Sequence, residues 1–139
     1  MSDAPTPASE EPAHDPEVLQ LAAKVFDLAR DGDTDTLAAY VDAGVPVNLT
    51  NDKGDSLLML AAYYGRTPTV RALLDRGADP DRINDRGQSP LAGAVFKDEE
   101  EMVRLLLEAG ADPNAGNPSA VDTARMFGRD SLLKLLGAG

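Results

Sequence analysis

The sequence predicts an all-α fold, an array of helix pairs in which each pair stacks on the next. The main observation is a repeat with a period of 33 residues, which superimposes residues 51–83 on residues 84–116. Within each copy, apolar residues at helical spacing are bounded by glycines and by Ser or Thr residues that begin helices. A fixed period of this kind is typical of arrays whose repeats bury their apolar faces against one another.

The two central copies agree in their glycines, small residues and leucines. Gly54, Ser56, Leu58, Ala61, Val70 and the triplet Gly77-Ala78-Asp79 align with Gly87, Ser89, Leu91, Ala94, Val103 and Gly110-Ala111-Asp112. The outer copies are weaker: Gly32 aligns with Gly65 in the first, and Ser119 aligns with Ser89 in the last, where the offset falls to 30. Divergent end copies suit a solenoid, because each end must present one face to water.

These motifs resemble the ankyrin repeat family, whose pattern joins a glycine turn, a Thr-Pro-Leu-like helix start, an Ala pair and a closing Gly-Ala-Asp. Ser89-Pro90-Leu91 and both Gly-Ala-Asp triplets match it in order and phase, although Met59 and Ala92 stand where the family usually has His. The resemblance covers about residues 17–137 and implies a solenoid of about four helix-turn-helix repeats joined by hairpin-like loops. It places the repeats near residues 17–50, 51–83, 84–116 and 117–139, within one domain over 16–139.

Helix starts are marked by residues that can accept a hydrogen bond from the first turn. Ser56 and its equivalents in the later copies are expected to cap the first helix of each repeat, and Thr34 or Asp33 to cap a second helix. Asp98 and Glu101 have the spacing of a capping box. The expected helices span residues 16–30, 34–43, 56–64, 67–76, 89–96, 99–109, 119–127 and 130–136.

The composition of the chain limits the kinds of partner that it can bind and the cellular compartment in which it is expected. The net charge of −11 argues against nucleic acid and anionic membrane surfaces, since both are polyanions. The chain has no Cys, no apolar run long enough to span a membrane and no leader-like start, so we expect a cytoplasmic protein. Residues 1–15 combine prolines and acids without Lys or Arg, which predicts a disordered acidic tail. The excess of Arg over Lys, with abundant Ala and Asp, is typical of a bacterial source.

Nothing in the sequence predicts catalysis, a cofactor or a metal site. The one His residue, His14, lies in the predicted tail, so the folded part has no His base and no His ligand. Glycine-rich phosphate loops are absent. Asp31, Asp33 and Asp35 alternate as in a calcium loop, but Thr36 occupies the position where that loop requires Gly, which favours turn and capping roles. We therefore expect a protein that is not an enzyme.

The family resemblance implies that partners contact the hairpin tips and the residues just after the Ala pair. These positions hold Asp52, Lys53, Asp55, Tyr63, Tyr64, Arg86, Gln88, Phe96, Lys97, Met126 and Phe127. We expect about half of the large apolar residues among them to pack inward, with Tyr63, Phe96 and Met126 facing the groove. The second helices carry arginines that are expected on a solvated outer face, namely Arg66, Arg71, Arg76 and Arg104. Asp79 and Asp112 are expected to brace their turns.

The sequence thus predicts a module that binds a protein partner through a concave groove and loop tips, with no nucleic-acid or membrane partner. A monomer is expected, and a homodimer through the aromatic residues stays open. The alternative function is that of an accessory or stress-response factor associated with a redox enzyme such as catalase. This alternative comes from a resemblance to small bacterial ankyrin proteins associated with catalase and peroxide resistance.

Overall fold

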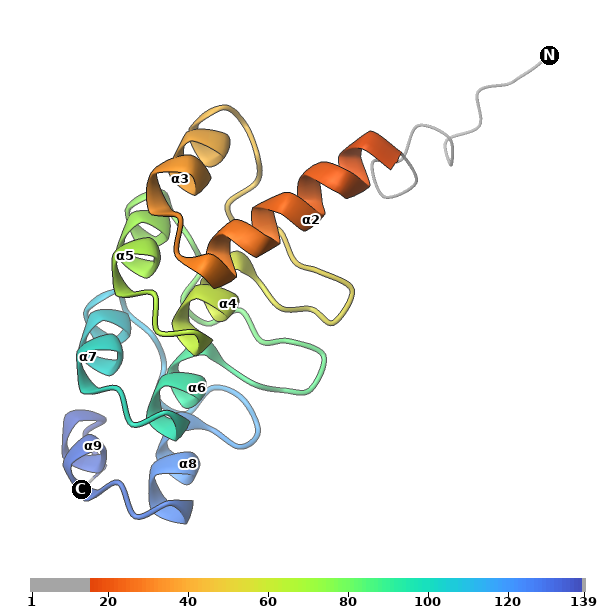
Figure 1. Ribbon diagram of the computed structural model, residues 1–139. Coiled ribbons are helices and arrows are strands. Elements are labelled where there is room, and N and C mark those ends of the chain that lie inside the picture. The colour runs from red at the N-terminus through yellow and green to blue at the C-terminus, as the bar shows by residue number, and fades with distance from the viewer. Residues whose placement is uncertain (1–15, 139) are drawn as a thin grey trace.

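The computed structural model describes residues 16–138 and confirms the all-α prediction. Four helix pairs stack along one direction (Figure 1). The pairs are α2 (Pro16–Asp31) with α3 (Thr34–Asp42), α4 (Leu57–Tyr63) with α5 (Thr67–Asp75), α6 (Pro90–Phe96) with α7 (Glu100–Glu108), and α8 (Ala120–Met126) with α9 (Asp130–Leu135). The predicted tail over residues 1–15 lies outside the described residues.

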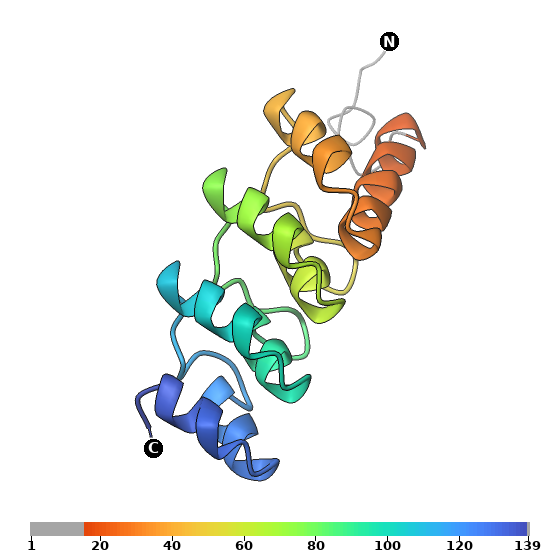
Figure 2. The same cartoon turned by 60° about the vertical axis from the view of Figure 1, so that its left-hand side comes forward.

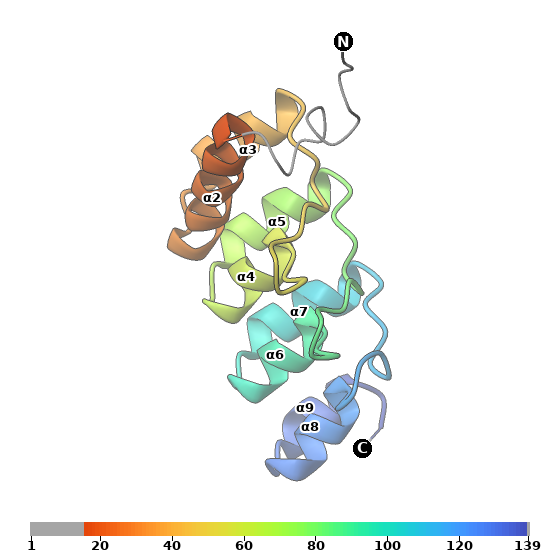
Figure 3. The ribbon, with the colours of Figure 1, turned by 90° about the vertical axis from the view of Figure 1, so that its right-hand side faces the viewer.

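The helices form two rows, and the connecting loops extend from the side of one of them. The inner row consists of α2, α4, α6 and α8, and the outer row of α3, α5, α7 and α9, with each helix packed against its neighbours in the row. In a second view, each helix pair is displaced sideways relative to the pair before it (Figure 2). The loops between pairs stack beside the inner row (Figure 3). No helix within residues 16–138 has the length and apolar character that a membrane crossing would need.

The core is one continuous apolar cluster that runs through all four pairs. Its inner row is built around Ala61, Ala94 and Ala124, which hold equivalent positions in successive repeats and are fully buried. An alanine at this position lets neighbouring inner helices approach closely, and fully buried leucines such as Leu91 and Leu106 fill the space between the two rows. Stability therefore depends on contacts between adjacent repeats as much as on contacts within one repeat.

Serine caps begin the inner helices of the last three pairs, as the sequence predicted. The side-chain oxygens of Ser56, Ser89 and Ser119 accept hydrogen bonds from backbone N–H groups three residues later, at 3.0, 3.0 and 3.1 Å. Each bond satisfies one of the N–H groups that a helix start leaves without an internal partner. The three caps fix the direction in which the inner helices leave their loops.

The predicted side-chain caps of the outer helices are wrong. Helix α3 has Asp33 as its N-cap residue and helix α7 has Glu99, and neither side chain caps its helix. Asp98 is not a cap because it occupies the turn that closes α6. It has a φ of 58° and stands 33 positions after Gly65, whose φ is 74°. The position thus ends the preceding helix in the left-handed conformation rather than starting the next one.

Replacing Asp98 by glycine should give a more stable protein than replacing it by alanine. The left-handed conformation destabilises an L residue by about 1 kcal/mol, whereas glycine adopts it without that cost. We expect the unfolding free energies of Asp98→Gly and Asp98→Ala to differ by about 1 kcal/mol, as measured by urea denaturation. Both variants lose the carboxylate near Arg129, so the comparison isolates the backbone effect. Equal stabilities would show that Asp98 is not strained.

Two arginines that flank α5 form polar contacts with the preceding repeat. Arg66 donates to the backbone oxygen of Arg30 at 2.7 Å, and Arg76 binds the Asp42 carboxylate through two nitrogens at 2.9 and 3.1 Å. Arg66, Arg71 and Arg104 are exposed as predicted, whereas Arg76 is half-buried, and Arg66 and Arg76 also bind the preceding repeat. The hydrogen bond between Arg76 and Asp42 lowers the pKa of this carboxyl and raises the pKa of the guanidinium.

The aspartates that follow each Gly-Ala pair brace their turns, as predicted. Asp79 accepts from the backbone N–H of Asp81 and Asp112 from that of Asn114, both at 2.9 Å. The backbone N–H groups of the same two aspartates also donate to the preceding repeat. That of Asp79 reaches the Asn48 side chain at 2.8 Å, and that of Asp112 reaches Asp81 at 2.7 Å. These bonds form a ladder that fixes the spacing of the loops.

Candidate functional site

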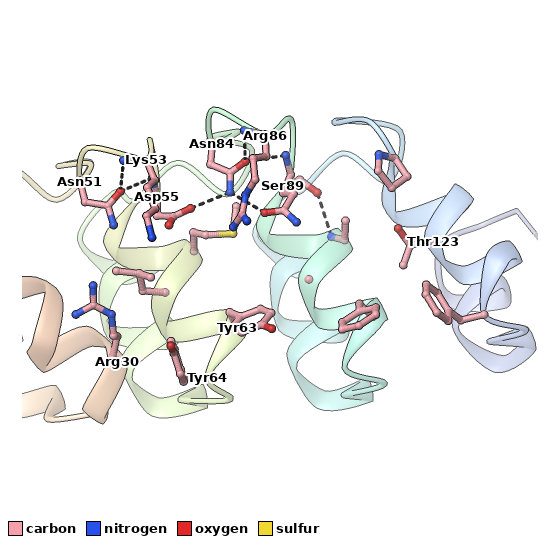
Figure 4. Close-up of a pocket in the computed structure, with 18 of the residues that line it drawn as sticks. Arg30, Asn51, Lys53, Asp55, Tyr63, Tyr64, Asn84, Arg86, Ser89 and Thr123 are labelled. Atoms are coloured by element: carbon pink, nitrogen blue, oxygen red, sulfur yellow. Dashed lines mark hydrogen bonds between the residues drawn. The ribbon is translucent and has the colours of Figure 1, made fainter.

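A groove of about 520 Å³ runs across the repeats between the hairpin loops and the inner helices (Figure 4). Of the eleven residues that the sequence analysis proposed for partner binding, nine line it: Lys53, Asp55, Tyr63, Tyr64, Arg86, Gln88, Phe96, Met126 and Phe127. Asp52 and Lys97 are exposed but lie outside this lining. The structure thus brings together residues from three repeats that are far apart in the sequence.

The hairpin edge of the groove is held by asparagines that the sequence analysis did not identify. The side-chain oxygen of Asn51 accepts from two backbone N–H groups of its own turn, both at 2.9 Å, and Asn84 does the same in the next hairpin at 3.0 and 2.9 Å. Both asparagines line the groove. The signal for them was present, because residues 51–54 and 84–87 both read Asn-Asp-basic-Gly at the repeat period.

Asp55 is part of this framework and is not a freely exposed tip residue. Its side chain accepts a hydrogen bond from the Asn84 side-chain nitrogen at 2.8 Å, and Asp55 and Asn84 are only 8 % and 6 % exposed. The same nitrogen donates to Gln88 at 2.9 Å. Next to these bonds, the backbone N–H of Asp85 donates to the Lys53 carbonyl at 3.0 Å. Adjacent hairpins are therefore fastened together, which fixes the shape of the groove edge.

The opposite edge of the groove is formed by exposed aromatic and methionine side chains. Tyr63 is 42 % exposed, Phe96 45 % and Met126 66 %, and Tyr64 and Phe127 are exposed as well. The expectation that about half of these residues pack inward is therefore wrong. Each of these residues is the last residue of α4, α6 or α8, or the C-cap that follows it, so all five stand where an inner helix passes into its turn.

Edge-to-face contacts order the exposed rings. The ring centres of Tyr63 and Tyr64 are 5.5 Å apart, and those of Phe96 and Phe127, which come from different repeats, are 5.2 Å apart. The Lys97 ammonium lies 4.7 Å from the centre of the Tyr63 ring, within the range of a cation–π interaction. Rings held by one another lose little freedom when a ligand covers them, which favours binding.

The floor of the groove contains small and apolar residues that the sequence analysis also missed. Ala92 and Gly93 leave a hollow beneath the hairpins, with the buried Met59 and Leu60 next to it. A Cβ atom at Gly93 would lie 3.8 Å from the Tyr63 ring, an ordinary van der Waals contact, so this part of the floor borders the aromatic edge. The remaining lining residues that were not predicted are Arg30, Ser89, Pro118 and Thr123. Met59 and Ala92 were noticed only as departures from the family pattern.

The chemistry of the groove is that of a binding surface. It offers aromatic faces, apolar floor atoms and the side chains of Lys53 and Arg86. Among residues 16–138, no three His, Cys, Asp or Glu side chains are grouped so that they could hold a metal ion. The arrangement can cover an apolar segment, orient it with polar contacts at the hairpin edge and exclude water from its centre.

Comparison with known proteins identifies the repeats. A family model that describes three ankyrin repeats matches residues 19–117 of the chain. The chain belongs to the ankyrin repeat family. Over 65 residues it is 46 % identical to a protein of Pseudomonas aeruginosa whose name describes it as an ankyrin repeat protein. The match covers 47 % of this chain and 35 % of that relative, so the chain spans about a third of the relative's length. Ankyrin repeats generally serve as protein-binding modules, and the predicted family and helix-pair solenoid are confirmed.

Proposed function

We propose that the groove binds a segment of a protein partner in the cytoplasm, and that the chain acts by binding rather than by catalysis. The observation that supports this most is the exposed apolar edge. The whole chain has six aromatic residues, three Tyr and three Phe, and four of them lie exposed along this edge beside Met126. A cluster of exposed rings on a protein this poor in aromatics marks an interaction surface, since water contact with these rings is unfavourable.

The rigidity of the groove supports the same function. The hairpin edge is fixed by the hydrogen bonds of Asn51 and Asn84, and the inner helices by their serine caps. A partner that docks here meets a surface that is already in its binding geometry and pays little to order it. Aromatic residues, Tyr in particular, are enriched among the few interface residues whose truncation costs about 2 kcal/mol or more, so we expect these two rings to carry a large share of the affinity.

The double substitution Tyr63→Ala with Phe96→Ala should weaken partner binding by about 100-fold or more. The tagged full chain would be used to capture partners from cells of its source organism, with mass spectrometry to identify them and titration to measure affinity. Both rings are exposed, so we expect the urea denaturation curve to stay near that of the wild type.

A matched control removes exposed apolar side chains elsewhere. Val18 and Leu19 are exposed on α2 and do not line the groove, so Val18→Ala with Leu19→Ala should leave the partner bound. A partner that the Tyr63/Phe96 variant retains would contradict the proposal. Loss of folding in that variant would show that the rings belong to the core instead. Recovery of a catalase as the groove-dependent partner would select the accessory-factor alternative.

A further inference from the structure

We infer that the groove accepts an extended acidic segment in which carboxylates alternate with aromatic or aliphatic side chains. This inference rests on the proposed function and specifies the chemistry of the partner. It comes from two features of the same surface, namely cations without an anionic partner on the hairpin edge and rings without a cover on the opposite edge.

The hairpin edge carries two cations that form no ion pair in the described part of the chain. Lys53 and Arg86 stand 33 positions apart, on successive hairpins, and both line the groove (Figure 4). Neither side chain forms an ion pair within residues 16–138. Lys97 adds a third cation on the opposite edge, where its ammonium sits over the Tyr63 ring.

The negative charge next to these cations is already engaged or lies outside the groove. Among the described residues that line the groove, Asp55 is the one carboxylate, and it is buried and holds the Asn84 side chain. Asp52 and Asp85 are exposed on the hairpins but do not line the groove. Arg30, which lines the groove on the side of α2, is paired with Asp27 at 2.7 Å. A ligand within the groove therefore meets Lys53 and Arg86 as its nearest unpaired charges.

The overall net charge of −11 does not oppose this local attraction. At physiological salt, charges farther than about 8 Å from one another are largely screened, so the many acidic residues distant from the groove contribute little to the field that a bound segment senses. A long polyanion such as nucleic acid would also lie against the acidic remainder of the surface and be repelled. The charge distribution thus selects a short acidic segment over an extended polyanion.

The positions of the two edges determine the pattern of such a segment. The unpaired Lys53 and Arg86 line one edge, and the rings line the other with Lys97 engaged by Tyr63, so a chain lying between the edges must direct polar and apolar side chains to opposite sides. An extended chain does this with a period of two residues, because its successive side chains point in opposite directions. The groove therefore favours acidic and apolar residues in alternation, with the carboxylates toward the hairpins.

The test is selection from a displayed library of random twelve-residue peptides against the full chain. We expect the selected peptides to carry net negative charge and to alternate Asp or Glu with Phe, Tyr or Leu. The charge reversal Lys53→Glu with Arg86→Glu should shift the selected peptides to net positive charge. The neutral variant Lys53→Gln with Arg86→Gln should weaken binding of the wild-type peptides about tenfold, with a smaller dependence on salt.

A matched control places the same change of net charge outside the groove. Arg71 and Arg82 are exposed, do not line it and form no ion pair within the described residues, so Arg71→Glu with Arg82→Glu should leave the peptide preference unchanged. Selection of neutral or basic peptides by the wild type, or of no peptides at all, would overturn the inference. It would also be overturned if a peptide of residues 1–15 displaced the selected ones with higher affinity, or if the groove bound a second copy of the chain.

Failure of this inference is distinguishable from failure of the proposed function. If the natural partner is lost from the Tyr63/Phe96 variant but the peptide selection shows no acidic preference, the groove binds a protein of other chemistry. If that variant retains both the natural partner and the peptides, binding takes place elsewhere and both proposals fall.

Discussion

Asn84→Ala should lower the free energy of unfolding by about 3 kcal/mol. The substitution removes hydrogen bonds to two backbone N–H groups of the hairpin and to the side chains of Asp55 and Gln88. The larger part of the loss comes from the Asp55 carboxylate, which stays buried after its neutral donor has gone. A buried group left without its partner costs more than the net gain of an ordinary hydrogen bond, and a charged group costs the most.

Asn51→Ala provides a comparison within the same molecule. Asn51 occupies the equivalent position one repeat earlier and accepts the same two backbone bonds, but its side chain holds no buried carboxylate. Its removal should cost about 1 kcal/mol, as measured by urea denaturation followed by circular dichroism. In the double variant Asn84→Ala with Asp55→Ala, part of the loss should be recovered. Equal effects of the two Asn substitutions would show that the bond to Asp55 contributes nothing.

Leu91→Ala should lower the free energy of unfolding by about 3–5 kcal/mol. Leu91 is fully buried on α6, which packs against α4, α7 and α8. A truncated side chain leaves a cavity between three helices, and each of these is held by its own loop or neighbour, so the space cannot close. Because the repeats stabilise one another through their contacts, the substitution should also broaden the denaturation transition as the repeats unfold less cooperatively.

Leu107→Ala is the matched control for this prediction. Leu107 lies on α7 and is only half-buried at the edge of the core, so it allows the same Leu-to-Ala change at a less buried position. We expect a loss of about 1 kcal/mol or less, since exposed parts of a side chain gain little from burial. Similar losses for Leu91→Ala and Leu107→Ala would contradict the central place of α6 in the stack.

The repeat period predicted most of the fold because each element is specified locally. Ser56 and Ser89 cap their helices within three residues along the chain, and the alanines of the inner helices recur at the same spacing as the core they build. Asp98 was misinterpreted where two patterns competed. Its spacing to Glu101 indicated a cap, while its position 33 residues after Gly65 indicated a left-handed turn, and the turn is what the structure has.

The site was harder to predict than the fold, because its decisive contacts join different repeats. Asp55 sits at a hairpin and its sequence suggests an exposed tip residue, but its partner Asn84 comes from the next repeat. Tyr64 and Phe127 are the C-cap residues of α4 and α8 and are exposed, although the sequence offered them equally as core residues. A sequence pattern indicates which face of a helix is apolar, but not whether a neighbour covers its last turn.

The junctions between repeats are not equivalent at the turns that lead from the inner to the outer helices. Arg66 reaches back to the preceding repeat at the first junction, and Arg129 does so at the third, where it donates to the Phe96 carbonyl at 3.1 Å. The corresponding residue of the second junction is Glu99, which lies against Gly65, and its Oε1 atom has no hydrogen-bond partner. Among residues 16–138, no hydrogen bond or ion pair joins the turns after α4 and α6.

The same junction is firmly joined at the hairpin edge by the bond between Asn84 and Asp55. On the side that carries Tyr63 and Phe96, this junction is held by the packing of α4 on α6 and by the Lys97 ammonium, which lies 4.7 Å from the centre of the Tyr63 ring. The spacing of the two rings is therefore set by apolar packing rather than by hydrogen bonds. A substitution that changes the volume between α4 and α6 would consequently alter the width of the groove without breaking a polar contact.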